Sequence, residues 1–512
     1  MKKKQVSIIL LLIFIQILLV IYGTNQKINF HVDEYLTFML ANNEAGMTLP
    51  IEKMHTYSGD ELFLNSLAVN EDHRFDFSIV WNNQINDTHP PFYYVLIHTV
   101  CSLFAGQFSK WFGLIVNLVF FILSAILVYK VSYKIFGNFI QSAATLALWG
   151  FTVGTINTAI FIRMYMMLSF WILALIYWHL KIYTDKKINI KSYLLLFLIT
   201  VAGTLTHYYF LVFLFFTALF YGIYMLCCRR TRDVILYVIT FVISAVIAIA
   251  MFPAMIKHIF YGARGEQAFD AFSASSGYIG SLIEYLKVVT NEVAGNIWIF
   301  GMLVLIALII LIMGSIKQGK DLLRKIVASP LFAFVLIGIG YYCIIAKIAP
   351  YISNRYISPI YSLIVIVEIA IIFKLKNMLI CNKYVQYIIP VVSCAIIVGA
   401  TWLYGLQNTY QWTKNILEMA SENSDKDVLY VYDAQTWKIP PSREELIRYN
   451  SFTFVTPENL ESYIQGKDLS NMVLYTITTL DQESILNQLK IANPGIEEEM
   501  LYQSFYATAY ML

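Results

Sequence analysis

Charged side chains are scarce in this chain of 512 residues, since only 13% are Asp, Glu, Lys or Arg, against about 25% in an ordinary soluble domain. This scarcity excludes a soluble globular protein and a disordered one. Hydrophobic residues make up 58% of the chain and stand in runs of about 17 to 21 residues, the length that crosses about 30 Å of hydrocarbon. The sequence therefore predicts a polytopic helical membrane protein.

Cysteine is equally scarce: the chain has six, all in or beside apolar runs, and the polar C-terminal region has none. They are Cys101, Cys227, Cys228, Cys343, Cys381 and Cys394. A disulfide framework and a metal-binding C-x-x-C are both excluded, so we expect packing alone to hold the extracytoplasmic parts. The chain also lacks a G-x-G-x-x-G, a P-loop and a repeat of fixed period, which argues against a nucleotide-driven pump.

The first apolar run, 6–22, follows three lysines, but Gly23-Thr24-Asn25 offers no A-x-A cleavage site. We therefore expect an uncleaved first span with a cytoplasmic N-terminus. Ten further runs bring the expected spans to eleven: 111–129, 140–160, 165–181, 192–206, 208–227, 233–252, 293–313, 330–348, 356–373 and 384–404. The positive-inside rule puts the loops rich in Lys and Arg in the cytoplasm. These loops contain Lys2–Lys4, Lys130, Lys134, Lys181, Lys186, Lys187, Lys191, Arg229, Arg230, Arg232, Lys317, Lys320, Arg324, Lys325, Lys374, Lys376 and Lys383.

This topology leaves four segments on the outer face: the loop 23–110, the turn at Arg163, the loop 253–292 and the region after about 405. The short apolar segment 91–105 is expected to be a half-inserted helix. Residues 418–512 carry 15 acidic and 6 basic side chains, or −9, while the other 30 basic and 18 acidic side chains sum to +12. The charge shift predicts a separate C-terminal compartment.

Short β-like runs at 428–432 and 472–478, with helical patterns at 410–421 and 481–490, favour a small α/β domain there. The expected fold is thus an all-α polytopic membrane domain of about eleven transmembrane helices, residues 1–404, followed by a small extracytoplasmic α/β accessory domain, residues 405–512.

Two polar motifs lie in the first outer loop. His31-Val32-Asp33-Glu34-Tyr35 places two adjacent carboxylates about ten residues beyond the first span, and Asp87-Thr88-His89-Pro90-Pro91-Phe92-Tyr93-Tyr94 leads into an aromatic helix. Taken singly, the first motif fits solvated loop charges, and Asp87 fits a cap on the helix that the prolines begin. Together, in this order, they favour a catalytic site.

The combination resembles the GT-C glycosyltransferases, in particular bacterial relatives of the dolichyl-phosphate-mannose protein mannosyltransferases and the lipid A aminoarabinose transferases. Asp33-Glu34 matches the acidic motif of that superfamily, and His89 to Tyr94 matches its H-P-P-L/F-Y-Y-like motif. The resemblance covers roughly residues 1–375. Arg163-Met164-Tyr165 is similar to the family's R-x-Y segment, although Phe161 stands where an acidic residue is common.

The resemblance implies transfer of a sugar from a polyprenyl-phosphate donor to an acceptor hydroxyl on the outer face. The departing phosphate needs stabilisation by cations more than a general acid, while the hydroxyl needs a carboxylate base, which predicts one displacement with inversion. By resemblance Asp33 is the base and Glu34 the reserve. Expected substrate-binding residues are Asp87, His89, Tyr93, Arg163, Tyr165, His207, Tyr208 and Arg355, with Arg355 the first candidate for the lipid phosphate.

Each cation at a span end also fits simple anchoring at the membrane interface. The sequence requires no cofactor, although Asp33, Asp87 and His89 are possible ligands of a divalent metal. Expected partners are the lipid donor, a lipid, glycan or protein acceptor, and the bilayer of the cell membrane, with no nucleic acid. The alternatives are a polysaccharide polymerase or flippase, and a secondary transporter. A transporter has little support, because Glu368 is the main ionisable residue at mid-membrane and inverted repeats are not evident.

Overall fold

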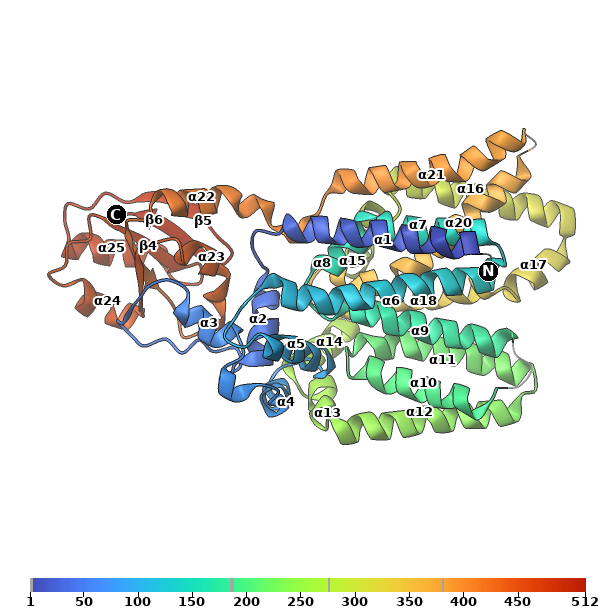
Figure 1. Cartoon of the computed structure of the whole chain (residues 1–512), viewed down its shortest axis with the longest axis horizontal. Helices are drawn as coiled ribbons and strands as arrows, with labels where there is room; N and C mark the ends of the chain where they lie inside the picture. Colours follow the sequence, from blue (N-terminus) through green and yellow to red (C-terminus); the bar gives the residue numbers. More distant parts are fainter. Residues whose placement is uncertain (1–2, 185–187, 275–276, 380–381) are drawn as a thin grey trace. The chain divides into compact units, whose positions relative to one another are not determined.

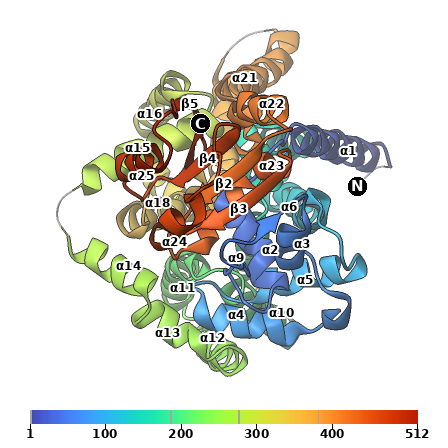
Figure 2. The same ribbon diagram turned by 90° about the vertical axis from the view of Figure 1, so that its left-hand side faces the viewer.

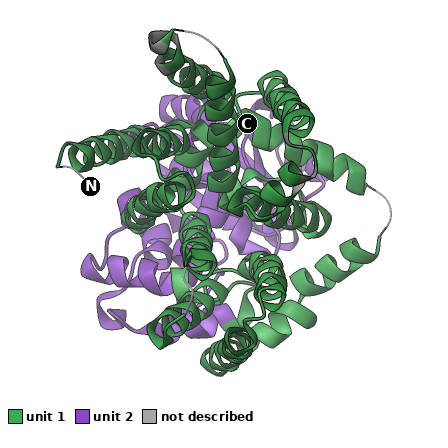
Figure 3. Cartoon of the chain, turned by 90° about the vertical axis from the view of Figure 1, so that its right-hand side faces the viewer, with its two compact units in different colours: residues 1–23, 85–93, 114–406 green, residues 24–84, 94–113, 407–512 purple. Residues whose placement is uncertain are grey.

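The computed structural model describes residues 3–184, 188–274, 277–379 and 382–512. Lys2, Lys186, Lys187 and Cys381, which entered the sequence arguments above, lie outside these ranges. The chain divides into two compact units (Figure 3). Unit 1 contains residues 1–23, 85–93 and 114–406, and unit 2 contains residues 24–84, 94–113 and 407–512.

Unit 1 is a bundle of apolar helices (Figure 1). Within the described ranges, eight helical segments are long and apolar enough to cross a membrane. They are α1 (Lys3–Asn25), α6 (Lys110–Phe136), α9 (Tyr165–Thr184), α11 (Tyr209–Cys227), α12 (Thr231–Met251), α16 (Ile297–Gln318), α18 (Pro330–Ile348) and the continuous segment of α19 (Asn354–Ile357), η2 (Ser358–Ile360) and α20 (Tyr361–Met378).

The remaining expected spans are helices too, but they are bent or shorter. Run 140–160 is a pair, α7 (Phe139–Phe151) and α8 (Val153–Ile160), bent by 57°. Shorter apolar helices are α10 (Ile190–Thr204) and the apolar part of α21 (Lys383–Tyr404). The eleven expected runs are therefore all helical, and the protein is an integral membrane protein of the predicted all-α class. Segment 91–105 forms α5 (Phe92–Leu103), and its half-insertion stays a prediction.

The bend between α7 and α8 has a local cause. Thr152 between them is extended (φ −68°, ψ 145°), which interrupts the helical hydrogen bonds. The Val153 N–H donates instead to the Thr401 hydroxyl of α21, at 3.2 Å, so the buried backbone donor is satisfied. At the other end of α8, the Asn117 amide of α6 donates to the carbonyls of Ala159 (3.0 Å) and Phe161 (2.6 Å). These bonds fix the turn that carries the next residues, up to Arg163.

The expected outer loop 253–292 is helical rather than irregular. It contains α13 (Ala254–Phe260), α14 (Ala263–Ser273) and α15 (Tyr278–Glu292), and the further short helix α17 (Lys320–Val327) joins α16 to α18. α13 and α14 bring polar residues of this loop beside the turn between α10 and α11, where the cavity described below lies.

Unit 2 is built around a six-stranded sheet. The strand order is β1 (Thr56–Tyr57), β3 (Ser451–Val455), β2 (Asp427–Val431), β4 (Met472–Ile477), β6 (Ala507–Met511) and β5 (Glu499–Gln503). Strands β2 to β5 are labelled in Figure 2. β2 pairs in parallel with β3 and β4, and the outer pairings are antiparallel. The predicted α/β domain is confirmed, and β1 shows that the first outer loop adds a strand to its sheet.

The helices of unit 2 come from both parts of the chain. From the first outer loop come α2 (Val32–Asn42), α3 (Glu61–Leu67), η1 (Glu71–His73) and most of α4 (Phe77–Asn86) and α5. From the tail come η3 (Gln407–Thr409), η4 (Gln411–Thr413), α22 (Lys414–Glu422), η5 (Thr436–Lys438), η6 (Pro440–Ser442), α23 (Arg443–Leu446), α24 (Pro457–Ile464) and α25 (Gln482–Ala492).

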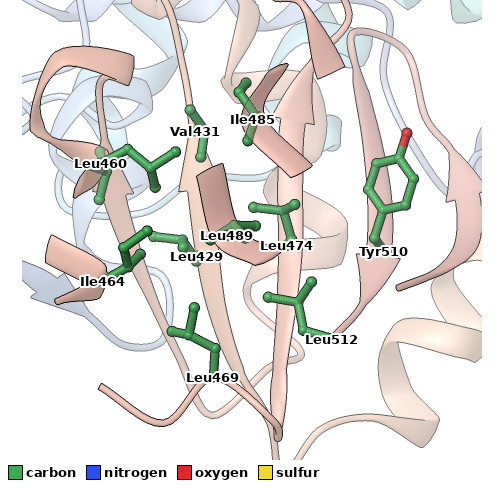
Figure 4. Close-up of a cluster of buried hydrophobic side chains, with 11 residues drawn as sticks. Leu429, Val431, Leu460, Ile464, Leu469, Leu474, Ile485, Leu489, Tyr510 and Leu512 are labelled. Carbon is green, nitrogen blue, oxygen red and sulfur yellow. The ribbon is translucent and has the colours of Figure 1, made fainter. Parts of the chain in front are cut away.

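A dry cluster holds α24 and α25 against the sheet (Figure 4). Leu429 and Val431 of β2 and Leu474 of β4 meet Leu460 of α24 and Leu489 of α25, and each is almost fully buried. The alternation of apolar side chains along β2 and the 3.6-residue period of the two helices place these residues on facing surfaces.

Buried ion pairs, as well as apolar packing, hold unit 2 together. The absence of disulfides had suggested that packing alone would do so. The Lys27 ammonium and the Glu34 carboxylate form a fully buried ion pair at 2.8 Å, and Lys27 also donates to the Asn408 carbonyl at 2.8 Å. Arg443 of α23 pairs with Asp60 of the outer loop, with Nε to Oδ1 at 2.7 Å. Both ion pairs lie where the first outer loop meets the tail inside this unit.

A buried carboxyl makes the stability of unit 2 sensitive to pH. The Glu445 side chain is fully buried and accepts hydrogen bonds from Tyr475 (3.2 Å) and Ser504. Burial raises the pKa of Glu445 to about 7. The folded chain therefore keeps a proton that the unfolded chain loses from about pH 4.5 upward, and we expect about 3 kcal/mol of stability to be lost between pH 4.5 and 7.

The measurement is the melting temperature of the full chain in detergent from pH 4.5 to 8, compared with Glu445→Gln, which is neutral throughout. The difference between the two proteins isolates this group from every other titration. Equal pH profiles would show that Glu445 ionises normally in the folded chain.

Candidate functional site

Unit 1 contains a cavity of about 270 Å³ at the ends of α10, α11 and α18, beside α13 and α14. Its described lining combines three histidines, three tyrosines and an arginine with an apolar wall. The lining residues are Thr88, His89, His207, Tyr208, Tyr209, Leu211, Val212, His258, Ile259, Arg264, Gly265, Gln267, Ala268, Ile348, Pro350 and Tyr356. A tyrosine and histidine rim beside an aliphatic wall suits a ligand with one polar and one hydrocarbon end.

One side of the cavity is a hydrogen-bonded chain through Asp87, His89 and Arg163. His89 Nδ1 lies 2.9 Å from Asp87 Oδ2, and His89 Nε2 lies 3.3 Å from an Arg163 guanidinium nitrogen. Arginine only donates, so Nε2 accepts and Nδ1 carries the proton that Asp87 accepts. These two contacts orient the His89 ring. Burial would raise the pKa of Asp87, but His89 and Arg163 outweigh it and the pKa stays lowered.

The turn between α10 and α11 supplies His207 and Tyr208. His207 Nδ1 accepts the Tyr209 backbone N–H at 3.0 Å. Burial, together with the nearby His89, Arg163 and Arg355, holds the pKa of His207 well below its usual range. His207 is therefore neutral near pH 7 and offers a donor at Nε2.

His258 of α13 is fixed from both sides. Its Nε2 lies 3.2 Å from the Ile85 carbonyl, which can only accept, so this nitrogen carries the proton. Its Nδ1 then accepts from the Tyr208 hydroxyl at 2.9 Å. Burial lowers the pKa of His258. Among the described lining residues, Arg264 carries the permanent positive charge.

The position of Arg355 differs from the expectation. Its guanidinium lies 5.1 to 5.6 Å from the ring centres of Tyr356, Tyr351 and Phe161, and the residue is 6% exposed. Among the described lining residues, Tyr356 is present and Arg355 is not. Arg355 thus supports one wall of the cavity, while Arg264 of α14 reaches its lining. Arg264 and His258 were not predicted as site residues. The one feature of the sequence that could have indicated them is their position in the second outer loop, 253–292.

Tyr93 and Tyr165 are also supporting residues. Tyr93 is fully buried and donates to the Asn117 side chain at 2.9 Å. Tyr165 is 2% exposed, and its ring lies 5.5 Å from the His207 ring. Neither belongs to the described cavity lining, whereas His89, His207 and Tyr208 do.

A second buried polar cluster, which the sequence did not indicate, lies around Glu292 at the end of α15. Its carboxylate accepts from Asn157 of α8 (3.2 Å), Asn354 of α19 (2.7 Å) and Tyr361 of α20 (2.7 Å). Gly154 permits this approach, because a Cβ there would meet the Glu292 backbone oxygen at 2.9 Å. The cluster joins four helices directly beside Arg355.

Removing this carboxylate should destabilise the membrane unit. Glu292→Leu leaves three donors without an acceptor in a fully buried site, and each unsatisfied group costs about 1–3 kcal/mol. We expect a melting temperature several degrees lower in detergent. Glu292→Gln keeps one acceptor oxygen and should lose less. Equal melting of the Leu variant and the parent would contradict the structural role.

Asp33 and Glu34 lie in unit 2, at the start of α2, and their environments differ. His31 caps the helix, with Nδ1 accepting the Asp33 N–H at 3.1 Å. Glu34 is fully buried against Lys27 and also accepts the His31 N–H at 2.9 Å. The Asp33 side chain is 21% exposed. The sequence ranked Asp33 as the base and Glu34 as its reserve, and the structure shows that Glu34 is held in a buried ion pair with Lys27.

The suggested metal ligands do not form a metal site in unit 1. His89 uses Nδ1 for Asp87 and Nε2 for Arg163, so a metal would have to displace one partner and lie beside a guanidinium. Over the described ranges, no group of three or more His, Cys, Asp or Glu is arranged to hold a metal ion.

Comparison with known proteins gives a structural match and no sequence match. No protein-family model matches the chain, and no curated protein sequence matches it. The structure is similar to ArnT from Cupriavidus metallidurans bound to undecaprenyl phosphate, with a TM-score of 0.55, 10% identity, and 98% of this chain and 97% of that chain covered. The protein has the GT-C fold. The apo form of ArnT is similar as well, with a TM-score of 0.51 and 10% identity over 99% and 96% of the two chains.

The structure is also similar to an archaeal enzyme. The apo oligosaccharyltransferase of Archaeoglobus fulgidus gives a TM-score of 0.50 and 10% identity, over 99% of this chain and 74% of that one. With ArnT, the match includes the C-terminal region as well as the membrane bundle, since almost the full length of both chains is covered. The GT-C architecture inferred from the motifs is therefore confirmed.

Proposed function

We propose that this protein is an integral membrane glycosyltransferase that moves a sugar from a polyprenyl-phosphate donor to an acceptor hydroxyl. The observation that carries the proposal is the cavity, where, among the described lining residues, the Arg264 cation and three histidines adjoin an aliphatic wall. A lipid phosphate has the same two-part chemistry. The GT-C fold, seen in ArnT with undecaprenyl phosphate bound, supports this assignment.

The donor would lie with its phosphate near Arg264 and its chain along the apolar wall. Arg264 donates to Gln267 at 2.8 Å, and both residues are exposed, so the guanidinium can turn to a phosphate oxygen without leaving a buried acid. Leu211, Val212 and Ile348 of the lining supply hydrocarbon contact. His207, which is neutral, adds a donor that contributes no charge.

We assign the base to Asp33. The acceptor oxygen attacks the anomeric carbon from the face opposite the phosphate, the new C–O bond forms as the C–O bond to phosphate breaks, and the configuration inverts. The electron pair leaves on the phosphate, whose charge Arg264 stabilises, and the hydroxyl proton goes to the carboxylate. Glu34 cannot take this proton while it is bound to Lys27, so it is not the reserve base that the sequence suggested.

We further propose that transfer takes place on the outer face, with residues 1–404 forming the transferase domain and 405–512 the accessory domain. The Lys and Arg residues at the ends of the helices favour a cytoplasmic N-terminus. Single cysteines at positions 270 and 460, in a cysteine-free protein, should react with a membrane-impermeant reagent in intact cells, while one at 376 should be protected. The reverse pattern would overturn this orientation.

The direct test is turnover. Purified protein is incubated with a panel of polyprenyl-phosphate sugars and acceptors, and released polyprenyl phosphate is measured with and without acceptor. Release that depends on the acceptor and on a single-sugar donor supports the proposal. Activity only with oligosaccharide-lipid donors would identify a polymerase, and binding of a free solute without any release would identify a transporter.

A further inference from the structure

A groove of about 520 Å³ runs between α1, α6 and α9. α1 begins and α6 ends at the same end of unit 1 (Figure 1). The lining residues of the groove are Val6, Ile9, Leu10, Ile126, Tyr129, Lys130, Tyr133, Lys134 and Tyr177. It is separate from the cavity, because the two share no lining residue. Along α9, Tyr177 lies twelve residues beyond Tyr165, or about 18 Å.

The polar part of the groove is a cluster of cations and phenols. Lys130 and Lys134 stand one turn apart on α6, and like charges so placed repel each other. Tyr129 and Tyr133 stack at 5.9 Å, and the Lys134 ammonium lies 5.9 Å from the Tyr177 ring centre. None of the nine described lining residues is acidic. A bound anion would relieve the repulsion and accept from both ammonium groups.

The rest of the groove is hydrocarbon. Val6, Ile9 and Leu10 come from the first turns of α1, and Ile126 comes from α6, one turn before Lys130. A soluble phosphate would gain nothing from these side chains. An acyl chain would bury apolar surface against them while its headgroup met the lysines, as basic pockets between membrane helices do for anionic lipids.

We propose that this groove binds an anionic phospholipid, with its phosphate between Lys130 and Lys134 and one acyl chain along α1. The site lies among the Lys-rich and Arg-rich helix ends, which the positive-inside rule assigns to the cytoplasmic leaflet. Leu10 of α1, which lines the groove, is 62% exposed. The lipid therefore acts as a bridge that joins α1 to α6 where protein contact is slight.

The test is native mass spectrometry of the full chain, purified in mild detergent and offered equal amounts of phosphatidylglycerol and phosphatidylcholine. We expect one phosphatidylglycerol to be retained in preference. Lys130→Gln with Lys134→Gln should weaken that retention at least tenfold, because two charge-assisted contacts are lost. The matched control is Lys374→Gln with Lys376→Gln, which removes two charges near the end of α20 and leaves the groove intact.

Three results would overturn the proposal: no preference for phosphatidylglycerol in the parent, equal loss in both double variants, or full displacement by glycerol phosphate at millimolar concentration. The second result would show a general electrostatic attraction, and the third an anion site without a lipid component. Thermal unfolding provides a second measurement. Added phosphatidylglycerol should raise the melting temperature of the parent and the control pair, but not of the groove pair.

Discussion

Asp33→Asn is expected to lower turnover by about 10² to 10⁴ with little change in donor binding. The amide keeps the size of the side chain and its place in the first turn of α2, but it cannot accept the acceptor's proton in the transition state. The measurement is release of polyprenyl phosphate at saturating donor, with donor affinity measured separately on the same preparations.

The matched control is Asp76→Asn, which removes a half-exposed carboxylate from the same outer loop of unit 2 and should leave turnover unchanged. Glu34→Gln should act differently, because it breaks a fully buried ion pair with Lys27 and should lower the melting temperature first. If Asp33→Asn keeps near-parental turnover while a folded Glu34→Gln protein is inactive, the roles within the pair are reversed. If both retain activity, the glycosyltransferase proposal fails for this loop.

Arg264→Gln should weaken donor binding by about 10- to 100-fold, because a charge-assisted contact with a phosphate is worth about 1.5–3 kcal/mol. The loss should appear in the affinity for the product, polyprenyl phosphate, as well as for the donor, since both carry the phosphate. Titration of each lipid against the detergent-purified protein measures this.

Lys257→Gln is the matched control for Arg264→Gln. It makes the same change of charge in the same outer loop, but Lys257 is exposed and is not among the described residues that line the cavity. Equal weakening by both substitutions would indicate long-range attraction rather than contact. Arg355→Gln should weaken binding through the wall that Tyr356 forms, and it should also lower the melting temperature, which Arg264→Gln should not.

The sequence predicted the elements with a strong local signal. Apolar runs predicted the long helices of unit 1 with end errors of up to seven residues, and the two β-like runs became β2 and β4. It did not predict β5 and β6, whose short segments carry mixed polar residues. Nor could it predict β1, because Thr56 and Tyr57 become a strand only by pairing with β3, almost 400 residues later.

The site shows the same limit. His89, His207 and Tyr208 were identified because they stand in motifs or at span ends, and they line the cavity. Arg264 was missed because an arginine in a long polar loop has no pattern that separates it from a solvated charge. The sequence did not predict the ion pair of Glu34 for a related reason. Its partner Lys27 is seven residues earlier and lies before the start of α2, so the pair has no helical spacing that would indicate it.

The way the chain passes five times between the two units also constrains its biogenesis. Lys27 donates to the Asn408 carbonyl, which is 381 residues later in the chain, and Asp60 pairs with Arg443, which is 383 residues later. At a translation rate of about 5–20 residues per second, the first outer loop waits about 20 to 75 s for the segments that complete its fold. During synthesis its half-buried surfaces are therefore exposed to chaperones and proteases, and any substitution that slows insertion of the intervening helices prolongs that exposure.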